Sequence, residues 1–299
     1  GGASYVDAVR RIWDEGDAVF PLDQRLPKQS QSALIEHMAA SVIVDSGGET
    51  SVAGTPVETG DALVVATSGS TGLPKGVVLT HDALAANAEA TNSYLDVESN
   101  TDKWLACLPL SHVGGFSVVV RALHSEVALE VHDGFDADRV SEAAQNGATL
   151  VSLVPTAMGR IDTAHFRKVL VGGSAVPSDR PSNVIATYGM TETGSGVIYN
   201  RRPLEGVELR IQQGEIQIRC PMLFRCYRDG SDPRTGDGWF PSGDAGSLDT
   251  DGLLTVHGRK GDMIITGGEN VWPVAVERLL ESASGVAECA IVGRPDPEW

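Results

Sequence analysis

The chain has 299 residues, 41% of them hydrophobic and 21% charged, a globular composition whose length suits one large domain or two smaller ones. Its 40 acidic and 23 basic residues give a formal net charge of −17. This excess of acid disfavours nucleic acid or an anionic membrane as the main partner, because both require a clustered basic surface.

The four cysteines, Cys107, Cys220, Cys226 and Cys289, form no C-x-x-C pair, and no histidine lies at zinc-finger spacing from them. Reduced thiols in a cytoplasmic protein are therefore expected. The chain has no apolar run of 18 or more residues, and it does not start with a basic end followed by an apolar core. These patterns predict neither a membrane span nor secretion.

The N-terminal part predicts helices followed by strands. Within residues 3–41 apolar residues recur at helical spacing, first around Val9 and then around Ile35. Residues 41–44 predict a short buried strand that ends at a Gly-containing turn. Residues 62–66 form an apolar run of the kind found in parallel sheets that are covered on both faces.

The central part alternates strands and helices. Residues 77–79 predict a short strand, and Thr80 is expected to cap a helix over residues 83–92. A second helix is expected over residues 137–146. Further strands are expected over residues 104–108, 127–131, 150–154, 169–171 and 184–187. This alternation predicts an α/β fold with largely parallel sheets.

The pattern changes after about residue 205. Residues 207–211, 215–219 and 253–257 alternate apolar and polar side chains, and Gly-containing turns lie between them. Such segments predict antiparallel strands with one exposed face. The sequence therefore predicts a smaller β subdomain appended to the α/β body.

The most informative segment is the loop from Thr67 to Val77, of sequence TSGSTGLPKGV. Its glycines let the backbone approach a polyanion, while its hydroxyl groups and Lys75 supply donors and positive charge. An ordinary flexible loop would need neither the lysine nor flanking buried strands, so the segment predicts a phosphate site. It differs from the P-loop of NTPases, because Pro74 stands where that motif requires its second glycine.

The segment from Thr67 to His81 closely resembles the signature of the adenylate-forming, AMP-binding superfamily, which includes acyl-CoA synthetases, peptide-synthetase adenylation domains and luciferases. Further segments resemble the motifs of that superfamily in the same order along the chain. They are PLSH at residues 109–112, YGMTET at 188–193, SGD at 242–244, and the stretch from GRKGD at 258–262 to GGEN at 267–270. The resemblance covers about residues 60–299.

The resemblance implies a large N-terminal adenylate-forming domain over residues 1–260, with its β-rich subdomain at about 205–260. The hinge and the start of a small mobile C-terminal domain are expected over residues 261–299. In the superfamily the catalytic lysine for adenylation lies near the end of that domain, so we expect a truncated chain. Gly261 stands where relatives usually carry Asp or Lys as the hinge, and a glycine there rotates easily.

The resemblance also implies roles in an ATP site. Lys75 and the loop before it are expected to hold the β- and γ-phosphates, Tyr188 to lie against the adenine, and Thr191 to bond the α-phosphate. Glu192 is expected to hold Mg²⁺, a hard ion that prefers carboxylate and phosphate oxygens. The expected nucleotide-binding residues are Thr67, Ser68, Gly69, Ser70, Thr71, Gly72, Lys75, Gly172, Gly173, Ser174, Tyr188, Gly189, Met190, Thr191, Asp244 and Arg259.

The expected reaction has two halves. A substrate carboxylate attacks the α-phosphorus of ATP to give an acyl-adenylate and pyrophosphate, and CoA then attacks the adenylate. Mg²⁺, Lys75 and loop amides would offset the repulsion between the anionic reactants. The residues assigned to catalysis are His112, Lys75, Thr191 and Glu192, and Gly267 and Gly268 are assigned to the CoA side.

The nature of the acid depends on a second resemblance. Arg121 follows His112, the expected wall of the acyl pocket, by nine residues. An arginine at the end of an apolar run usually keeps its head in water, but a diacid would require such a cation in its pocket. The o-succinylbenzoate–CoA ligases of bacterial menaquinone biosynthesis, which this chain is similar to, carry a basic residue at this spacing. The expected substrate-binding residues are His112, Arg121, Gly189 and Thr193.

Other functions stay open at this point. Within the superfamily the alternatives are an aryl or medium-chain acyl-CoA ligase and a peptide-synthetase adenylation domain. A non-catalytic nucleotide-binding relative is the alternative from another class. The expected partners are a small carboxylic acid, ATP and CoA, with no nucleic acid and no membrane span, and a homodimer is one option left open.

Overall fold

The computed structural model describes residues 2–67, 74–281, 283, 285–286, 289–294 and 296. The chain divides into two compact units. The first comprises Gly1–Gly206 and Cys220–Asp232, and the second comprises Val207–Arg219 and Pro233–Trp299. This division does not test the domain boundary expected near residue 260, which stays a prediction.

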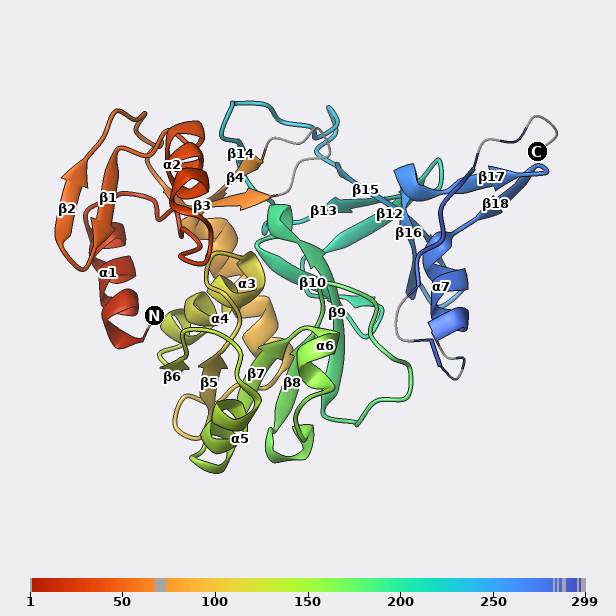
Figure 1. Ribbon diagram of the computed structural model, residues 1–299, viewed down its shortest axis with the longest axis horizontal. Helices are drawn as coiled ribbons and strands as arrows, with labels where there is room; N and C mark the ends of the chain where they lie inside the picture. The colour runs from red at the N-terminus through yellow and green to blue at the C-terminus, as the bar shows by residue number, and fades with distance from the viewer. Residues whose placement is uncertain are drawn as a thin grey trace. The chain divides into compact units, whose positions relative to one another are not determined.

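A seven-stranded sheet forms the centre of the first unit (Figure 1). Its strands in spatial order are β11 (Arg202–Pro203), β10 (Ser195–Tyr199), β9 (Val184–Met190), β8 (Lys168–Val171), β7 (Leu150–Leu153), β5 (Lys103–Ala106) and β6 (Ala128–Val131). Strands β5 to β9 pair in parallel, whereas β10 and β11 add antiparallel to one edge. The predicted α/β fold with a largely parallel sheet is therefore confirmed.

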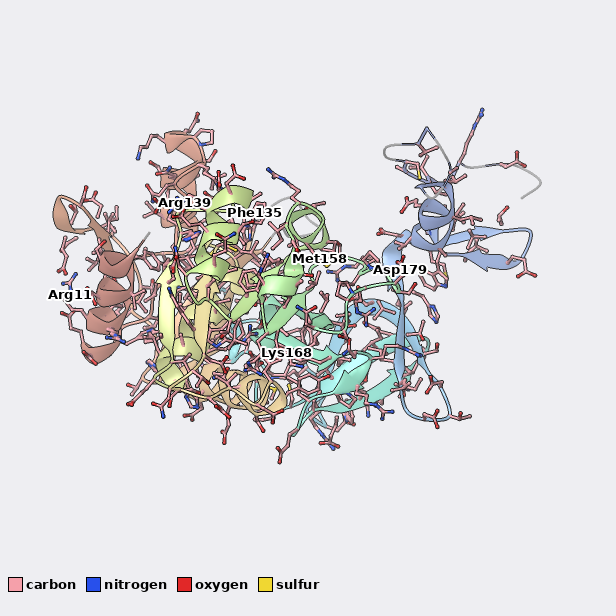
Figure 2. All side chains as sticks on the ribbon, turned by 90° about the horizontal axis from the view of Figure 1, so that it is seen from below. Arg11, Phe135, Arg139, Met158, Lys168 and Asp179 are labelled. Carbon is pink, nitrogen blue, oxygen red and sulfur yellow. The ribbon has the colours of Figure 1, made fainter. Side chains whose placement is uncertain are left out.

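Alternate residues of the parallel strands lie on opposite faces of this sheet, as the strand repeat requires. On one face, Leu105 and Val151 pack with Val140 of helix α5 (Ala137–Gln145). Phe135, labelled in Figure 2, packs against the same core. Short helices α6 (Pro155–Met158) and η1 (Thr163–His165) follow β7.

Helices α3 (His81–Tyr94) and α4 (Val113–His124) pack on each other and on strands of the same sheet. The helix expected after Thr80 begins where predicted, because the Thr80 Oγ1 accepts a hydrogen bond of 3.1 Å from the Ala83 backbone N–H. Helix α4 is apolar around most of its circumference and is buried from Gly115 to Ala122. Arg121 lies within that buried stretch.

A second, three-stranded sheet in the first unit has the order β14 (Cys226–Tyr227), β4 (Lys75–Thr80), β3 (Asp61–Thr67). Strand β3 is buried, as its apolar run predicts, but the expected parallel pairing is wrong. It pairs antiparallel with β4, with Val65 opposite Val77. The physical reason is the short connection over residues 68–74, since a parallel pair needs a crossover of about a dozen residues or more.

The N-terminal segment contains α1 (Ala3–Asp14), α2 (Lys28–His37) and a hairpin of β1 (Val42–Asp45) with β2 (Gly48–Ser51). The strand expected over residues 41–44 is present, but the expectation that it is buried is wrong. Val42 is 45% exposed and Val44 is 37% exposed. Strand β1 pairs with β2 alone in a two-stranded sheet, so an apolar run here does not mark a core strand.

The second unit contains a four-stranded antiparallel sheet of β12 (Glu208–Gln212), β13 (Glu215–Arg219), β15 (Phe240–Leu248) and β16 (Leu254–Arg259). The antiparallel strands predicted after residue 205 are therefore confirmed. The chain continues through η3 (Lys260–Asp262), the hairpin of β17 (Ile264–Thr266) and β18 (Glu269–Val271), and α7 (Pro273–Glu281). Within the described part of the chain, none of the helices combines the length and apolar character that crossing a bilayer requires.

An ion pair between the buried carboxylate of Asp102 and Arg167, whose side chain is 36% exposed, lies at the start of the parallel sheet. Asp102, which precedes β5, is 4% exposed. Its two carboxylate oxygens accept hydrogen bonds of 2.9 and 2.6 Å from Arg167, and Thr149 donates another of 2.6 Å. Burial alone would raise the pKa of Asp102, but Arg167 and the other donors outweigh burial and hold this pKa below its ordinary value.

We expect Asp102→Asn to lower the free energy of unfolding by about 2 kcal/mol at neutral pH, because it weakens the charge-assisted hydrogen bonds between Asp102 and the partly exposed Arg167. The folded-state pKa is lowered, so this stabilisation is present above the unfolded-state pKa of about 4 and is lost as pH falls through the folded-state value. Urea unfolding of parent and variant across pH measures the difference, with exposed Asp7→Asn as the control. A difference that persists unchanged well below pH 4 would contradict this assignment.

Candidate active site

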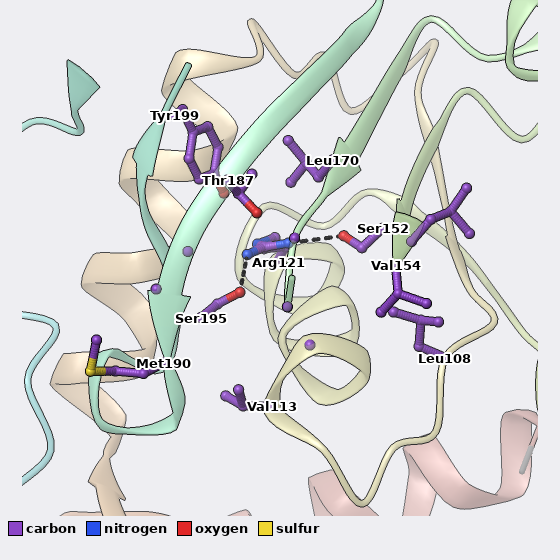
Figure 3. Close-up of a pocket in the computed structure, with 16 residues that line it drawn as sticks. Leu108, Val113, Arg121, Ser152, Val154, Leu170, Thr187, Met190, Ser195 and Tyr199 are labelled. Atoms are coloured by element: carbon purple, nitrogen blue, oxygen red, sulfur yellow. Dashed lines mark hydrogen bonds between the residues drawn. The ribbon is translucent and has the colours of Figure 1, made fainter. Parts of the chain in front are cut away.

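A pocket of about 140 Å³ lies at the carboxyl ends of β7, β8 and β9, where the N-terminal half of α4 faces the sheet (Figure 3). Leu108, Val154, Leu170 and Met190 contribute apolar walls. A cavity of roughly 150 Å³ holds one benzene ring, so the pocket is the size of a single aromatic ring. This end of a parallel sheet is the usual place for a ligand in α/β proteins.

Two glycines of this pocket are required by close backbone approach. A Cβ at Gly189 would lie 2.1 Å from the Ser195 carbonyl oxygen, and a Cβ at Gly172 would lie 2.3 Å from Thr187 Oγ1. Both glycines, with Gly173, line the pocket. Gly172 and Gly189 therefore have a packing reason as well as the nucleotide role that the resemblance implies.

Arg121 reaches the pocket from α4, and its side chain is 2% exposed. Its guanidinium donates hydrogen bonds of 2.7 Å to Ser195 Oγ and 3.3 Å to Ser152 Oγ, both drawn in Figure 3. A longer contact of 3.5 Å joins it to Asn87 Oδ1. The guanidinium also lies 5.6 Å from the centre of the Trp104 ring.

The charge of Arg121 is not balanced by a carboxylate among the residues that the structure describes. Its partners are hydroxyl groups, an amide and a ring, and its buried Nε has no hydrogen-bond partner there. Burial lowers the pKa of Arg121, although a guanidinium stays protonated in proteins. A desolvated cation of this kind can bind an anion strongly, because little water competes for it. The pocket therefore combines space for one ring with an unbalanced positive charge.

We expect Arg121→Met to raise the free energy of unfolding by about 1 kcal/mol, because an apolar side chain removes an uncompensated buried charge. The matched control is Arg167→Met, which leaves the Asp102 carboxylate buried and should lower this free energy by about 3 kcal/mol. Chemical denaturation of both variants tests the contrast. A clear loss of stability in Arg121→Met would show that the fold needs the guanidinium.

A second cluster surrounds Glu192, which lies in η2 (Thr191–Thr193) directly after β9. The Tyr227 hydroxyl donates a hydrogen bond of 2.8 Å to Glu192 Oε1. Lys75 Nζ lies 4.7 Å from the centre of the Tyr227 ring. Burial and the neighbouring Glu192 carboxylate raise the pKa of Tyr227, so its hydroxyl stays protonated and able to donate. Tyr227 thus contacts both Lys75, which is predicted to bind phosphate, and Glu192, which is predicted to hold Mg²⁺.

Tyr227 is absent from the residues predicted by sequence. It lies in a short strand, β14, between the predicted strands of the β subdomain and outside every motif considered above. Its contacts arise because β14 pairs antiparallel with β4, with Tyr227 opposite Val77. No sequence pattern near residue 227 indicates that pairing.

The residues near Glu192 fit the expected Mg²⁺. The described residues include no group of three His, Cys, Asp or Glu side chains that could hold a metal ion. Mg²⁺ is usually bound by one or two carboxylates together with substrate phosphates and water, not by an all-protein cage. A single carboxylate that shares Tyr227 with Lys75 is therefore an appropriate donor set for an ion that would arrive with a nucleotide.

His112 and Thr193, two further residues predicted to bind the acid, differ in their surroundings. His112 is exposed at the N-cap of α4, and its side chain makes no capping hydrogen bond. It does not line the pocket, so its role in binding the acid stays a prediction. Thr193 is fully buried, and its Oγ1 lies 2.7 Å from the Ser195 carbonyl oxygen and 3.0 Å from the Met190 nitrogen. These contacts give Thr193 a structural part in the turn between β9 and β10.

The predicted loop is only partly described. Thr67 and Lys75 lie at the facing ends of β3 and β4, where Thr67 Oγ1 is 3.4 Å from the Lys75 carbonyl oxygen. Ser68, Gly69, Ser70, Thr71 and Gly72 lie outside the described residues. Tyr188 belongs to β9, Thr191 begins η2, and Ser174 is exposed after β8. Their expected nucleotide contacts stay predictions.

In the second unit two of the predicted nucleotide-binding residues, Asp244 and Arg259, lie together. Asp244 on β15 is opposite Arg259 on β16, and its Oδ1 is 3.2 Å from the arginine Nε. Gly261 lies in η3. Gly267 and Gly268 have φ values of +57° and +81° and form the turn between β17 and β18, a conformation typical of glycine pairs in two-residue hairpins. The hinge and CoA-side roles stay predictions.

Comparison with known proteins identifies one family that this chain is similar to. Residues 51–228 match the family described as AMP-binding enzyme. The chain is 36% identical over 268 residues to a 2-succinylbenzoate–CoA ligase of Lactococcus lactis, an alignment covering 80% of this chain and 58% of the relative. It is 32% identical over 279 residues to the ligase of the same name from Enterococcus faecalis, covering 80% of this chain and 57% of the relative. The chain thus spans a little under three fifths of the length of these relatives.

Solved structures of similar proteins share the fold. One is the o-succinylbenzoate CoA synthetase of Bacillus subtilis in complex with its acyl-adenylate intermediate, with a TM-score of 0.79 and 26% identity over 98% of this chain and 69% of that one. The same enzyme with ATP and magnesium ion gives a TM-score of 0.76 and 25% identity over 97% of this chain and 70% of that one.

Proposed function

Since this chain belongs to the AMP-binding enzyme family, we propose that the whole protein is an ATP-dependent acid–CoA ligase. In this proposal it adenylates 2-succinylbenzoate and transfers the acyl group to CoA in menaquinone biosynthesis. The observation that carries the choice of acid is the buried Arg121, without a carboxylate partner among the described residues, in a pocket of one-ring size. The names of the relatives from Lactococcus and Enterococcus support it.

The nucleotide half of the proposal rests on Lys75 and Glu192, which the structure joins through Tyr227. Lys75 and the loop before it would hold the β- and γ-phosphates, and Thr191 would bond the α-phosphate. Tyr188 would stack on the adenine. A bound Mg²⁺, held by Glu192 and phosphate oxygens, would supply neutralisation of phosphate charge. The residues of the chain align the two anionic reactants and reduce their repulsion, which is most of what adenylation requires.

In the second unit, Asp244 and Arg259 are the residues proposed to bind the ribose. Asp244 would accept hydrogen bonds from the ribose hydroxyls. Its contact of 3.2 Å with Arg259 supports a carboxylate that is held in one orientation, since a guanidinium is a rigid donor for a carboxylate. Arg259 would then contribute a fixed positive charge near the ribose.

The acid half of the proposal concerns the pocket lined by Arg121, which residues on both sides of η2 also line. The aromatic ring of 2-succinylbenzoate would fill the space between Leu170 and Met190, and one carboxylate would bind Arg121. Ser195 and Ser152, which already accept hydrogen bonds from Arg121, would keep the guanidinium directed at the substrate. The other carboxylate would be left free to attack the α-phosphorus of ATP.

The whole protein is expected to release AMP with 2-succinylbenzoate and CoA, and to do so far better than with either monoacid that lacks one carboxylate. The two monoacids are 4-oxo-4-phenylbutanoate, without the ring carboxylate, and 2-butanoylbenzoate, without the chain carboxylate. Coupled AMP release measures kcat/KM for each acid. Efficient turnover of fatty or aryl monoacids but not of the diacid would identify another acyl-CoA ligase, and no acid-dependent pyrophosphate exchange would identify a non-catalytic nucleotide-binding protein.

Arg121→Ala should lower kcat/KM for 2-succinylbenzoate by about 100-fold or more, because truncating one partner of a buried charge pair costs about 2–5 kcal/mol. The affinity for ATP, measured by calorimetry without acid, should stay within about twofold, since the lost contact involves the acid alone. The preference for the diacid over the monoacid that lacks the Arg121-bound carboxylate should disappear in this variant. Unchanged kinetics would remove Arg121 from the acid site.

The proposed partners are small molecules, namely the acid, ATP and CoA. We place the reaction in the cytoplasm, where ATP and CoA are both available. Sedimentation of the whole protein distinguishes a monomer from a homodimer.

A further inference from the structure

The segment from Phe224 to Tyr227 holds Glu192 at two points. The Phe224 backbone N–H donates a hydrogen bond of 2.8 Å to the Glu192 carbonyl oxygen. Three residues later, the Tyr227 hydroxyl donates one of 2.8 Å to the Glu192 carboxylate. The same segment therefore fixes both the backbone and the side chain of the residue proposed to hold Mg²⁺.

Tyr227 itself is firmly placed. It is 7% exposed, and its ring lies 4.8 Å from the fully buried ring of Phe224. Its backbone pairs with Val77 in β4, and the Arg228 N–H bonds the Gly76 carbonyl oxygen. Tyr227 thus has little freedom to move with respect to Lys75, which begins the same strand β4.

We propose that Tyr227 is a positioning residue of the adenylation site, which orients the Glu192 carboxylate toward Mg²⁺ and holds the Lys75 amino group toward the phosphates. This inference rests on the proposed function. The hydroxyl donates to Oε1 of Glu192, which leaves the other carboxylate oxygen to face a metal ion. The face of the ring attracts the ammonium group of Lys75, as aromatic rings attract cations at this distance.

The physical need for such a residue follows from the donor set. Mg²⁺ would have Glu192 as its carboxylate here, and a flexible glutamate loses side-chain entropy when it binds an ion. A hydrogen bond to the second oxygen fixes the rotamer before the ion arrives. Partners of this kind typically change metal affinity by about 10–100-fold when they are removed.

Mn²⁺ in place of Mg²⁺ allows the test to be made without turnover. The whole protein is titrated with Mn²⁺ in the presence of ATP and the absence of acid, and free Mn²⁺ is measured by electron paramagnetic resonance. Tyr227→Phe keeps the ring near Lys75 and removes only the hydroxyl, so the Mn²⁺ affinity should fall by about 10-fold or more. The matched control is Tyr5→Phe, which removes a buried hydroxyl that has no hydrogen-bond partner among the described residues, and should leave Mn²⁺ affinity unchanged.

A double-mutant cycle with Glu192→Gln shows whether Tyr227 acts through Glu192. In the Glu192→Gln background, Tyr227→Phe should change Mn²⁺ affinity by less than about twofold. Tyr227→Leu also removes the ring, and it should weaken ATP binding further than Tyr227→Phe does. Thermal unfolding of every variant establishes that the folded protein is being compared.

Either of two results obtained with the variants would overturn the role assigned to Tyr227. One is a folded Tyr227→Phe protein with parental Mn²⁺ affinity, and the other is an undiminished effect in the Glu192→Gln background. If the parent protein binds Mn²⁺ and ATP but does not activate 2-succinylbenzoate, the choice of acid fails while the role of Tyr227 is still measured. If the parent shows no nucleotide-dependent Mn²⁺ binding, the proposed function and the role of Tyr227 both fail.

Discussion

The burial of the Arg121 guanidinium is the constraint on which the pocket between α4 and the parallel sheet depends. A cation between a helix and a parallel sheet is costly to desolvate, and the described residues offer it hydroxyl groups, an amide and an aromatic ring but no carboxylate. The rest of helix α4 compensates by being almost entirely apolar where it is buried. The alternation along β7 matters as well, because it directs Ser152 to Arg121 and leaves Val151 for the core on the other face.

The turn from β9 through η2 to β10 connects this pocket with the proposed metal site. Gly189 and Met190 line the pocket, and Glu192 follows two residues later with its carboxylate bound by Tyr227. Buried Thr193 bonds the backbone on both sides of the turn and so holds these residues in register. In the proposed function, this turn would carry a wall of the acid pocket and the carboxylate for Mg²⁺, and would therefore set the distance between the two reactants. Control of that separation is a large part of catalysis between two anions.

The sequence predicted the elements of the α/β body well, because their signals are local. The Thr80 cap and the strands of the large sheet depend on residues close in the chain, and they are present. The wrong predictions concern which strands pair with each other and which strands are covered by another layer. The apolar run of β3 could not indicate an antiparallel neighbour, and the apolar run of β1 could not reveal that its hairpin lacks a covering layer.

In the candidate site too, some residues could be expected from the sequence, whereas contacts between distant strands could not. Arg121 was expected in the acyl pocket because the chain resembles ligases that carry a basic residue at this position, against the usual preference of arginine for the surface. Ser195, which lies 74 positions further along the chain and accepts its shortest hydrogen bond, was not predicted. Tyr227 was missed for a related reason, since its contact with Glu192 depends on pairing between β14 and β4. Contacts made across strands distant in sequence leave no periodicity that a single sequence can show.

The return of residues 220–232 to the first unit bears on how the protein is made. This stretch lies between two parts of the second unit in the sequence, yet it supplies strand β14 and Arg225, whose guanidinium bonds the buried carboxylate of Asp61 at 2.8 and 2.9 Å. On the ribosome, β3 and β4 emerge long before that strand does. Until residues 220–232 have been synthesised, β4 therefore lacks its β14 neighbour and Asp61 lacks its arginine, so this sheet can be completed only late in synthesis.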